Sequence, residues 1–180
     1  TMAGLPTPGS TYHLLFATSN TYRPSTVASI PPPAPQFGSI AAADWLTTQA
    51  ASNAALPGAH SWNGVTPVYR SVLSIAGDHA RYRLSVFGPV LNLHGTQIAS
   101  SHTDLFDSNL AAPVAYNELG SLITANPDVW TGCTQLGLAA GQTCGTWNNP
   151  SSAATGRIGS ALESGDWASS VTGYPTSIRS

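Results

Sequence analysis

The sequence predicts an α+β fold, in which the main helix and most strands occupy different parts of the chain. Three observations favour this class. An alanine-rich stretch at residues 39–58 has apolar residues at helical spacing, and several short apolar segments end in turn-forming residues. The predicted order is one strand, one good helix and then many short strands joined by irregular loops.

Length and composition fit one domain with a linker. The chain has 180 residues, of which 42% are hydrophobic, and this is enough to build one sizeable core. Residues 1–11 are rich in Pro and Gly and are predicted to form a tail or the end of a linker. Residues 12–180 are therefore predicted to form a single domain.

Charged residues are scarce. Only 8% of residues are Asp, Glu, Lys or Arg, all six cations are arginines, and the formal net charge is -2. Because a basic surface for phosphate backbones is missing, no nucleic-acid partner is expected. No apolar run approaches the length of about 18 residues that a membrane span needs, so membrane insertion is not expected either. Surface polarity from Ser, Thr, Asn and Gln points to an extracellular or cell-surface location.

The first half of the domain is predicted to hold one strand, one loop and the main helix. Residues 12–22 are apolar and aromatic and end in turn-formers, which is typical of a strand. Residues 23–38 contain five prolines and predict a surface loop with polyproline character, either a spacer or a binding segment. For the helix over residues 39–58, Ser39 is the expected N-cap and Pro57-Gly58 the expected stop.

The second half is predicted to be rich in loops. Residues 71–85 fit either a strand or a turn, with Arg81 and Arg83 alternating along the strand. Residues 88–100 predict a hairpin around His94-Gly95, and Ser101 can begin a helical turn. Residues 109–128 form a long connection, and such connections are uncommon in compact domains unless they carry function. Residues 148–180 are dominated by Ser, Gly, Ala and Thr and are predicted to be loop-rich.

The two cysteines lie close together, at Cys133 and Cys144, each near a tryptophan. They fit buried thiols, a metal half-site or one disulfide. The segment between them contains turn-forming glycines and no histidine to complete a zinc site, so a disulfide is favoured. A disulfide would place the chain in an oxidising compartment.

Catalytic motifs are not evident. The sequence has no Gly-x-Ser-x-Gly elbow, and His79 and His102 are the only histidines that lie near carboxylates along the chain. Glu118 and Glu163 share no motif that would pair them as in a glycosidase. His102, with Asp104 and Asp107, offers metal-binding atoms, but a solvated polar turn explains this spacing better. We therefore expect no enzymatic activity, with a small secreted hydrolase that uses His102 or His79 as the alternative.

Six short motifs, taken in order, resemble the endostatin-like branch of the C-type-lectin-like fold. That branch includes the C-terminal domain of collagens XV and XVIII and secreted bacterial lectin-like domains. The resemblance covers roughly residues 12–170. Its motifs are Ala42-Ala43-Asp44, Leu56-Pro57-Gly58, Leu91 to Ile98 about Gly95, Trp130-Thr131-Gly132, Cys144-Gly145-Thr146-Trp147 and Ala154-Thr155-Gly156.

The resemblance implies one main helix on a small, twisted, mostly antiparallel sheet with long irregular loops. Trp130 and Trp147 would lie on adjacent strands and fill the core between sheet and helix. Both disulfides of the family have lost a partner here, because the helix cysteine is replaced and no cysteine follows Cys144. Cys133 offers a local substitute, so a Cys133–Cys144 disulfide is predicted.

Ligand contacts in this fold family come from the long loop region, which corresponds to residues 100–128 here. The predicted ligand-binding residues are therefore Tyr116, Asn117, Glu118, Asn126 and Asp128. Asn126-Pro127-Asp128 and Trp147-Asn148-Asn149 are similar to calcium-site triplets, but relatives of the endostatin type lack that calcium site. No cofactor is therefore expected.

The resemblance implies a non-catalytic recognition or adhesion module that binds a glycan or a cell-surface protein. The Pro/Gly-rich entry suggests the tip of a fibre, and endostatin-like domains cap trimers, so a homotrimer is a further expectation. A structural trimer cap without a small ligand is a third hypothesis. Glycan binding lost on Glu118→Ala or Asp128→Ala would separate the first hypothesis from the hydrolase.

Overall fold

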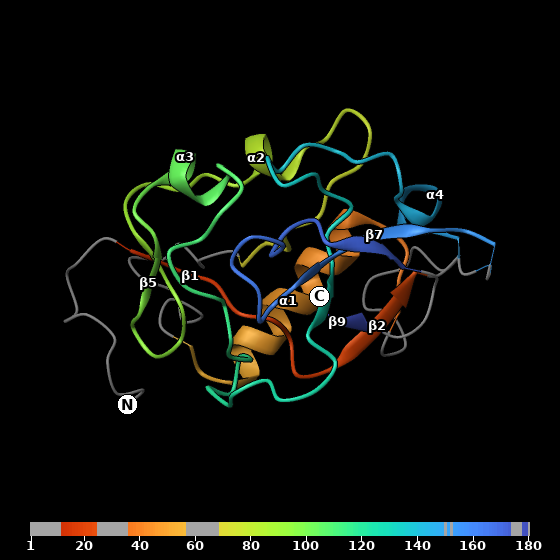
Figure 1. Ribbon diagram of the computed structural model, residues 1–180. Coiled ribbons are helices and arrows are strands. Elements are labelled where there is room, and N and C mark those ends of the chain that lie inside the picture. Colours follow the sequence, from red (N-terminus) through yellow and green to blue (C-terminus); the bar gives the residue numbers. More distant parts are fainter. Residues whose placement is uncertain are drawn as a thin grey trace.

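Two β-sheets and one long helix organise the chain (Figure 1). This computed structural model describes residues 12–24, 36–56, 69–149, 151, 153–173 and 178–179. The tail expected at residues 1–11 and most of the proline-rich segment lie outside the described residues. The described part mixes small sheets with few helices and is compatible with the α+β class that the sequence predicts.

The elements follow one another in a mixed order. The helices are α1 (Ile40–Asn53), α2 (Ala80–Arg83), α3 (His102–Leu105) and α4 (Cys144–Trp147). The strands are β1 (His13–Leu14), β2 (Thr21–Pro24), β3 (Gln36–Phe37), β4 (Val90–Leu91), β5 (Gln97–Ala99), β6 (Asp128–Trp130), β7 (Gly156–Ser160), β8 (Val171–Gly173) and β9 (Ile178–Arg179).

Among the described strands, β1, β4 and β5 form one sheet, and the order β3-β2-β9-β6-β7-β8 forms a larger one. The pairs β2–β9, β4–β5, β6–β7 and β7–β8 are antiparallel, whereas β1–β4, β2–β3 and β6–β9 are parallel. Four of these seven pairs are antiparallel, so the pairing is mostly antiparallel as expected, with three parallel pairs among them. Parallel pairs such as β1–β4 and β6–β9 join segments that lie far apart in sequence.

Helix α1 begins where the sequence predicts. The Ser39 side chain accepts a hydrogen bond from the Ala42 N–H and so satisfies one of the free amides of the first turn. The helix ends at Asn53 with Ala54 as C-cap, earlier than the predicted Pro57-Gly58 stop, which lies outside the described residues. Its buried face is mostly alanine, so its backbone can approach the sheet closely.

The hairpin expected around His94-Gly95 is present as β4 and β5. Asn92 organises the turn, because its Oδ1 accepts hydrogen bonds from the N–H groups of His94 and Thr96. Gly95 has φ +80°, which a residue without Cβ adopts most readily. The helical turn expected at Ser101 is also present: it is α3, and the Ser101 side chain caps the Asp104 N–H.

Three sequence-based expectations differ from the structure. The strand predicted over residues 12–22 is interrupted and gives β1 and β2. Arg81 and Arg83 lie on the short helix α2, not on a strand. The loop-rich ending predicted for residues 148–180 contains β7, β8 and β9, and β9 lies between β2 and β6 in the sheet. Its two described residues, Ile178–Arg179, are too few to form a recognisable pattern.

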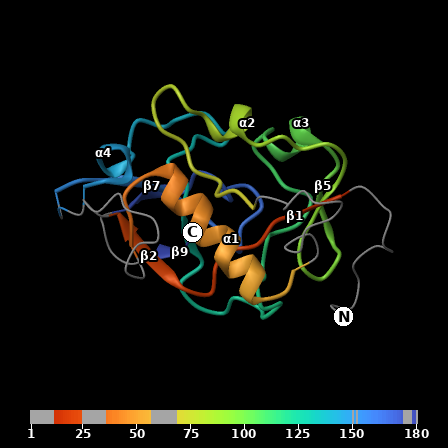
Figure 2. The same ribbon diagram turned by 180° about the vertical axis from the view of Figure 1, so that it is seen from behind.

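Trp130 and Trp147 fill the core between α1 and the larger sheet. Their ring centroids are 5.6 Å apart in an edge-to-face arrangement, and both side chains are almost fully buried. Leu46 and Ile40 of α1, and Ile158 of β7, belong to the same cluster. Figure 2 shows α1 crossing this sheet. The contact was predicted, but Trp147 lies on α4 rather than on an adjacent strand.

The predicted Cys133–Cys144 disulfide is absent, because both cysteines are free thiols. The chain folds back on itself after Cys133, where Ala140 N–H donates to the Gly132 carbonyl. Cys144 lies beside the start of β7, and its N–H donates to the carbonyl of Thr155, the residue before that strand. The two thiols therefore enter different core clusters, and the argument for an oxidising compartment loses its support.

Candidate functional site

The long connection predicted to bind ligand runs from the end of β5 to the start of β6. After α3, its described residues contain no further helix or strand until Asp128. The isolated bridge Ala17–Asn117 holds its middle part against the segment before β2, and the bridge Tyr116–Leu122 closes a turn within the connection. This part of the loop is therefore ordered by backbone pairing.

Glu118 is buried, with 4% of its surface exposed. Its carboxylate accepts a hydrogen bond from the Ser19 N–H at 2.5 Å and another from the Ser19 hydroxyl. A buried carboxylate needs such donors, because loss of water otherwise makes its charge very unfavourable. Glu118 therefore anchors the loop to the segment before β2, and its carboxylate does not face a ligand in solution.

Tyr116 and Asn117 are also engaged in local structure. The Tyr116 ring stacks on the exposed His94 ring, with centroids 3.8 Å apart and planes 6° apart. The Asn117 Oδ1 accepts hydrogen bonds from the N–H groups of Leu119 and Ser121 and so closes the turn. This turn presents two exposed leucines: Leu119 is 62% exposed and Leu122 57%.

Asn126 and Asp128 are both exposed, so two of the five predicted ligand-binding residues face solvent. Asn126 has φ +49°, a left-handed conformation that asparagine tolerates in turns. Asp128 begins β6 opposite Ser160. Within the described ranges, no group of three or more His, Cys, Asp or Glu side chains is placed to hold a metal ion, and this includes the triplets compared with a calcium site.

An open groove between α2 and α3 was not predicted from the sequence. Tyr82 and Phe87 line it and are 73% and 72% exposed, the highest values among the large hydrophobic side chains described. The groove has a volume of about 400 Å³, and its lining also includes Arg81, Ser85 and His102. Two exposed aromatic rings at one groove are unusual, because large apolar side chains in monomeric proteins are seldom gathered in solvent.

Helices α2 and α3 are joined by polar contacts that shape this groove. They lie at the same end of the molecule in both views (Figures 1 and 2). The His102 Nε2 lies 2.6 Å from the Arg81 carbonyl, and the Arg81 guanidinium donates to the Phe106 carbonyl at 3.2 Å. The groove is therefore formed by anchored elements. In the sequence, the two aromatic residues at 82 and 87, five positions apart, are the signal that could have identified it.

The histidines weighed as catalytic bases bond to backbone groups. The His79 Nδ1 accepts from the Ala139 N–H at 2.9 Å, so its proton resides on Nε2. The Nε2 of His102 donates to the Arg81 carbonyl. The nearby Asp104 carboxylate accepts from the N–H and the hydroxyl of Ser100, and these bonds lower the pKa of Asp104. Each of these groups thus has a structural role.

Comparison with known proteins gives no relative from which a role could be transferred: no family model matches the chain, and no curated protein matches it. Within the described residues, no helix is both long and apolar enough to span a membrane. The functional argument therefore depends on the groove and the loop themselves.

Proposed function

We propose that this chain is a non-catalytic recognition module that binds a glycan outside the cell or at a cell surface. The observation that carries the proposal is the exposure of Tyr82 and Phe87, which both line the α2–α3 groove. Exposed aromatic rings suit sugars, because the C–H faces of a sugar ring pack against the flat ring surface. The low charge of the chain suits a neutral ligand.

Polar groups beside the aromatic rings complete the chemistry of the proposed site. Sugar hydroxyls need hydrogen-bond partners at fixed positions, and the groove supplies the exposed Ser85 and the half-buried His102. The His102 Nε2 donates to a carbonyl, so its Nδ1 is an acceptor in the neutral ring. The groove therefore offers two aromatic rings for stacking, the Ser85 hydroxyl and the His102 Nδ1 as a hydrogen-bond acceptor.

We also propose that the domain is a member of the endostatin-like branch of the C-type-lectin-like fold. Support comes from α1 packed on the larger sheet, the hairpin of β4 and β5, and the long connection between β5 and β6. The packed pair of Trp130 and Trp147 adds to it. The free cysteines and the three parallel strand pairs depart from the family pattern. An experimental structure whose strand order differs from that fold would refute this assignment.

A glycan array followed by calorimetry tests the proposed function. The natural chain is expected to bind one class of sugar reproducibly, without converting it. Tyr82→Ala and Phe87→Ala are each expected to weaken binding about tenfold, which corresponds to about 1.4 kcal/mol for a stacking ring. Leu136→Ala is the control, because it removes another exposed apolar side chain that does not line the groove, and it should leave affinity unchanged.

Two results would count against the glycan proposal. Arrays that show no binding by the natural chain would remove it altogether. Binding that survives both aromatic substitutions but disappears on Asp128→Ala or Asn126→Ala would move the site to the loop predicted from the sequence. Turnover of an ester or glycoside, lost on His102→Ala, would instead support the hydrolase.

A second candidate function is assembly into a trimer that caps a fibre. The exposed pair Leu119 and Leu122 on one turn favours this, because neighbouring exposed leucines are a common feature of contacts between protein copies. Light scattering should then give three times the chain mass, and the double variant Leu119→Ser/Leu122→Ser should give the mass of one chain. A monomeric natural chain at high concentration would rule this contact out.

A further inference from the structure

Two histidines hold the segments that carry the aromatic rings of the α2–α3 groove. His13 lies in β1 beside Phe87, and the Phe87 N–H donates to its Nε2 at 2.9 Å. His79 precedes α2, and the Ala139 N–H donates to its Nδ1 at 2.9 Å. Each histidine therefore accepts a backbone N–H, which only an unprotonated ring nitrogen can do.

The contact between His13 and Phe87 has two possible forms. The His13 Nε2 that accepts the Phe87 N–H also lies 3.2 Å from the Phe87 carbonyl oxygen. In the neutral ring this nitrogen has no proton, so it bonds to the N–H. The protonated ring can only donate, so it must leave the N–H and bond to the carbonyl instead. One proton thus changes the backbone partner of His13 at a residue that lines the groove.

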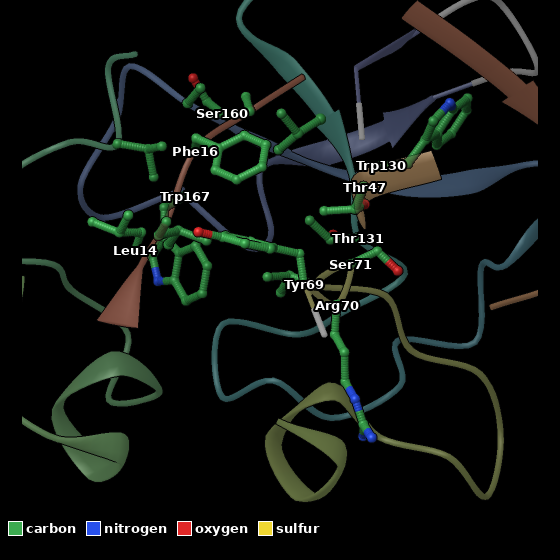
Figure 3. A pocket seen from close by; sticks show the side chains of 16 residues that line it. Leu14, Phe16, Thr47, Tyr69, Arg70, Ser71, Trp130, Thr131, Ser160 and Trp167 are labelled. Atoms are coloured by element: carbon green, nitrogen blue, oxygen red, sulfur yellow. The ribbon is translucent and has the colours of Figure 1, made fainter. Parts of the chain in front are cut away.

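His13 lies on an anchored strand, whereas Phe87 is exposed. The His13 N–H donates to the Pro89 carbonyl and pairs β1 with β4. Phe16 of the same segment points into an apolar cavity, where its ring contacts the Tyr69 ring with centroids 5.8 Å apart (Figure 3). Phe87 is 72% exposed and has no such packing around its ring. A change of partner therefore displaces Phe87 rather than β1.

His79 has the corresponding role for Tyr82. The His79 carbonyl accepts the Tyr82 N–H at 3.0 Å, and the two rings meet edge to face with centroids 5.7 Å apart. A proton on Nδ1 removes the acceptor of the Ala139 N–H, and with it the bond that orients the imidazole ring. The ring that packs beside Tyr82 is then no longer held in this orientation.

The described surroundings of the two histidines carry few other titratable groups. Residues 84–91 and 134–140, which provide their backbone partners, contain none. Those next to the histidines along the chain and on α2 are Tyr12, Asp78, Arg81, Tyr82 and Arg83. Asp, Arg and Tyr side chains ordinarily keep one charge between about pH 5 and 8, whereas histidine changes its charge there. Both histidines are half-buried, so protons from solvent can reach them.

We propose that acid weakens ligand binding in the α2–α3 groove through His13 and His79, which are positioning residues for Phe87 and Tyr82. The neutral histidines hold both aromatic rings in place for a ligand, and protonation removes the two bonds that do so. This inference rests on the proposed glycan function, because it concerns the regulation of the same groove. A glycan bound near neutral pH is therefore released in an acidic environment.

Nuclear magnetic resonance tests the switch without a ligand. The backbone N–H signals of Phe87 and Ala139 should move between about pH 7.5 and 5, with the midpoints of the His13 and His79 ring signals respectively. In His13→Gln the Phe87 signal should stay in place, because the amide oxygen accepts the N–H at every pH. Backbone signals that do not follow the histidine rings overturn the inference, whatever binds in the groove.

Calorimetry with the glycan found on the array tests the consequence for binding. The natural chain should lose about tenfold in affinity between about pH 7.5 and 5, as expected when one or two neutral hydrogen bonds are lost. The double variant His13→Gln/His79→Asn should bind equally at both pH values, because oxygen acceptors replace Nε2 and Nδ1 and do not titrate. His94→Gln is the control and should keep the pH dependence, because His94 does not line the groove.

The switch and the glycan proposal fail in different ways. If the natural chain binds equally at both pH values, the switch is wrong and glycan binding stands. The same holds if the double variant keeps the full acid loss, because His102 in the groove lining is then the group that titrates. Either single variant should keep part of the loss, and it replaces the double variant if that one does not fold. An array without binding removes the glycan proposal, and the Phe87 and Ala139 signals then decide whether the switch exists.

Discussion

Arg83 Nη1 on α2 donates to both carboxylate oxygens of Asp44 on α1, at 3.0 and 2.9 Å. The same carboxylate accepts from the N–H and the hydroxyl of Ser71, at 2.8 and 2.7 Å. The Arg83 side chain is 9% exposed, and its Nη2 donates to the Leu73 carbonyl as well. This pair therefore joins α1, α2 and the segment between them, and α2 is one wall of the proposed glycan site.

Asp44→Ala is expected to lower the free energy of unfolding by about 2 to 3 kcal/mol, because it leaves Arg83 and the Ser71 N–H without their partner. Chemical denaturation measures this difference. Asp78→Ala is the control, because Asp78 is half-exposed and reaches Arg83 Nε only at 4.0 Å. Its effect should stay below about 0.5 kcal/mol, the usual range for exposed pairs. Equal losses for both variants would contradict the assigned role of Asp44.

Gly132→Ala is expected to destabilise the fold by about 3 kcal/mol or more, since it combines strain with overlap. Gly132 has φ +59°, and an added Cβ would lie 2.6 Å from the Ser74 carbonyl oxygen and 2.7 Å from the Trp147 ring. Gly77→Ala separates the two causes, because Gly77 has φ +82° but nothing within 4 Å of the added carbon. It should lose only about 1 kcal/mol. Thermal or chemical unfolding that ranks the two variants equally would refute the close approach at Gly132.

Both thiols are expected to be free and unreactive in the native protein. Burial raises the pKa of Cys133 to about 12 and that of Cys144 to about 11, so little reactive thiolate exists at neutral pH. Iodoacetamide should label neither cysteine in native protein at pH 8 and both after unfolding without reductant. Mass spectrometry counts the labels. If the unfolded chain can be labelled only after reduction, the two cysteines form a disulfide in the native protein and the assignment of free thiols is wrong.

Stability is expected to fall as the pH rises above about 9. Below pH 9.0, the ordinary pKa of a thiol, both thiols are protonated in the folded and in the unfolded chain. Their burial then contributes fully to the free energy of unfolding. Above pH 9.0, the unfolded chain loses thiol protons that the folded chain retains until pH 11 to 12, so unfolding is favoured. Cys133→Ala should show a shallower decline of stability between pH 9 and 10 than the natural chain. An unchanged slope in denaturation curves would show that Cys133 is not the cause.

Glu118→Ala is expected to destabilise the protein by about 1 to 3 kcal/mol and to leave glycan binding unchanged under conditions where the variant is folded. The reason is that the carboxylate holds the Ser19 N–H inside the protein and does not face the α2–α3 groove. Ser19→Ala is the matched variant, since it removes the hydroxyl donor but keeps the N–H bond, and it should lose less. Array binding that disappears in folded Glu118→Ala would favour the loop site.

Local signals in the sequence predicted several elements because nearby residues alone determine them. Ser39 caps α1, Ser101 caps α3, and Gly95 with Asn92 forms the hairpin turn. Each depends on hydrogen bonds or backbone angles within a few residues. The packing of Trp130 with Trp147 was anticipated only from the resemblance to a fold family, and not from a local signal.

The long-range arrangement could not be read in the same way. The order β2-β9-β6 joins residues near 22, 178 and 129, and short strands like these have almost no pattern of their own. Glu118 looked like a surface carboxylate until Ser19, 99 residues away, provided its donors. The proposed glycan groove, likewise, exists only because His102 and Arg81 hold two short helices together.

The amino-acid sequence by itself thus determined the composition of the core, the main helix, the hairpin and the low charge, since these depend on propensities and on nearest neighbours. Tertiary structure decided that the thiols remain apart, that α2 is helical, and which polar side chains are buried and which aromatic ones face solvent. Those outcomes depend on contacts between distant segments, whose energies no local pattern encodes.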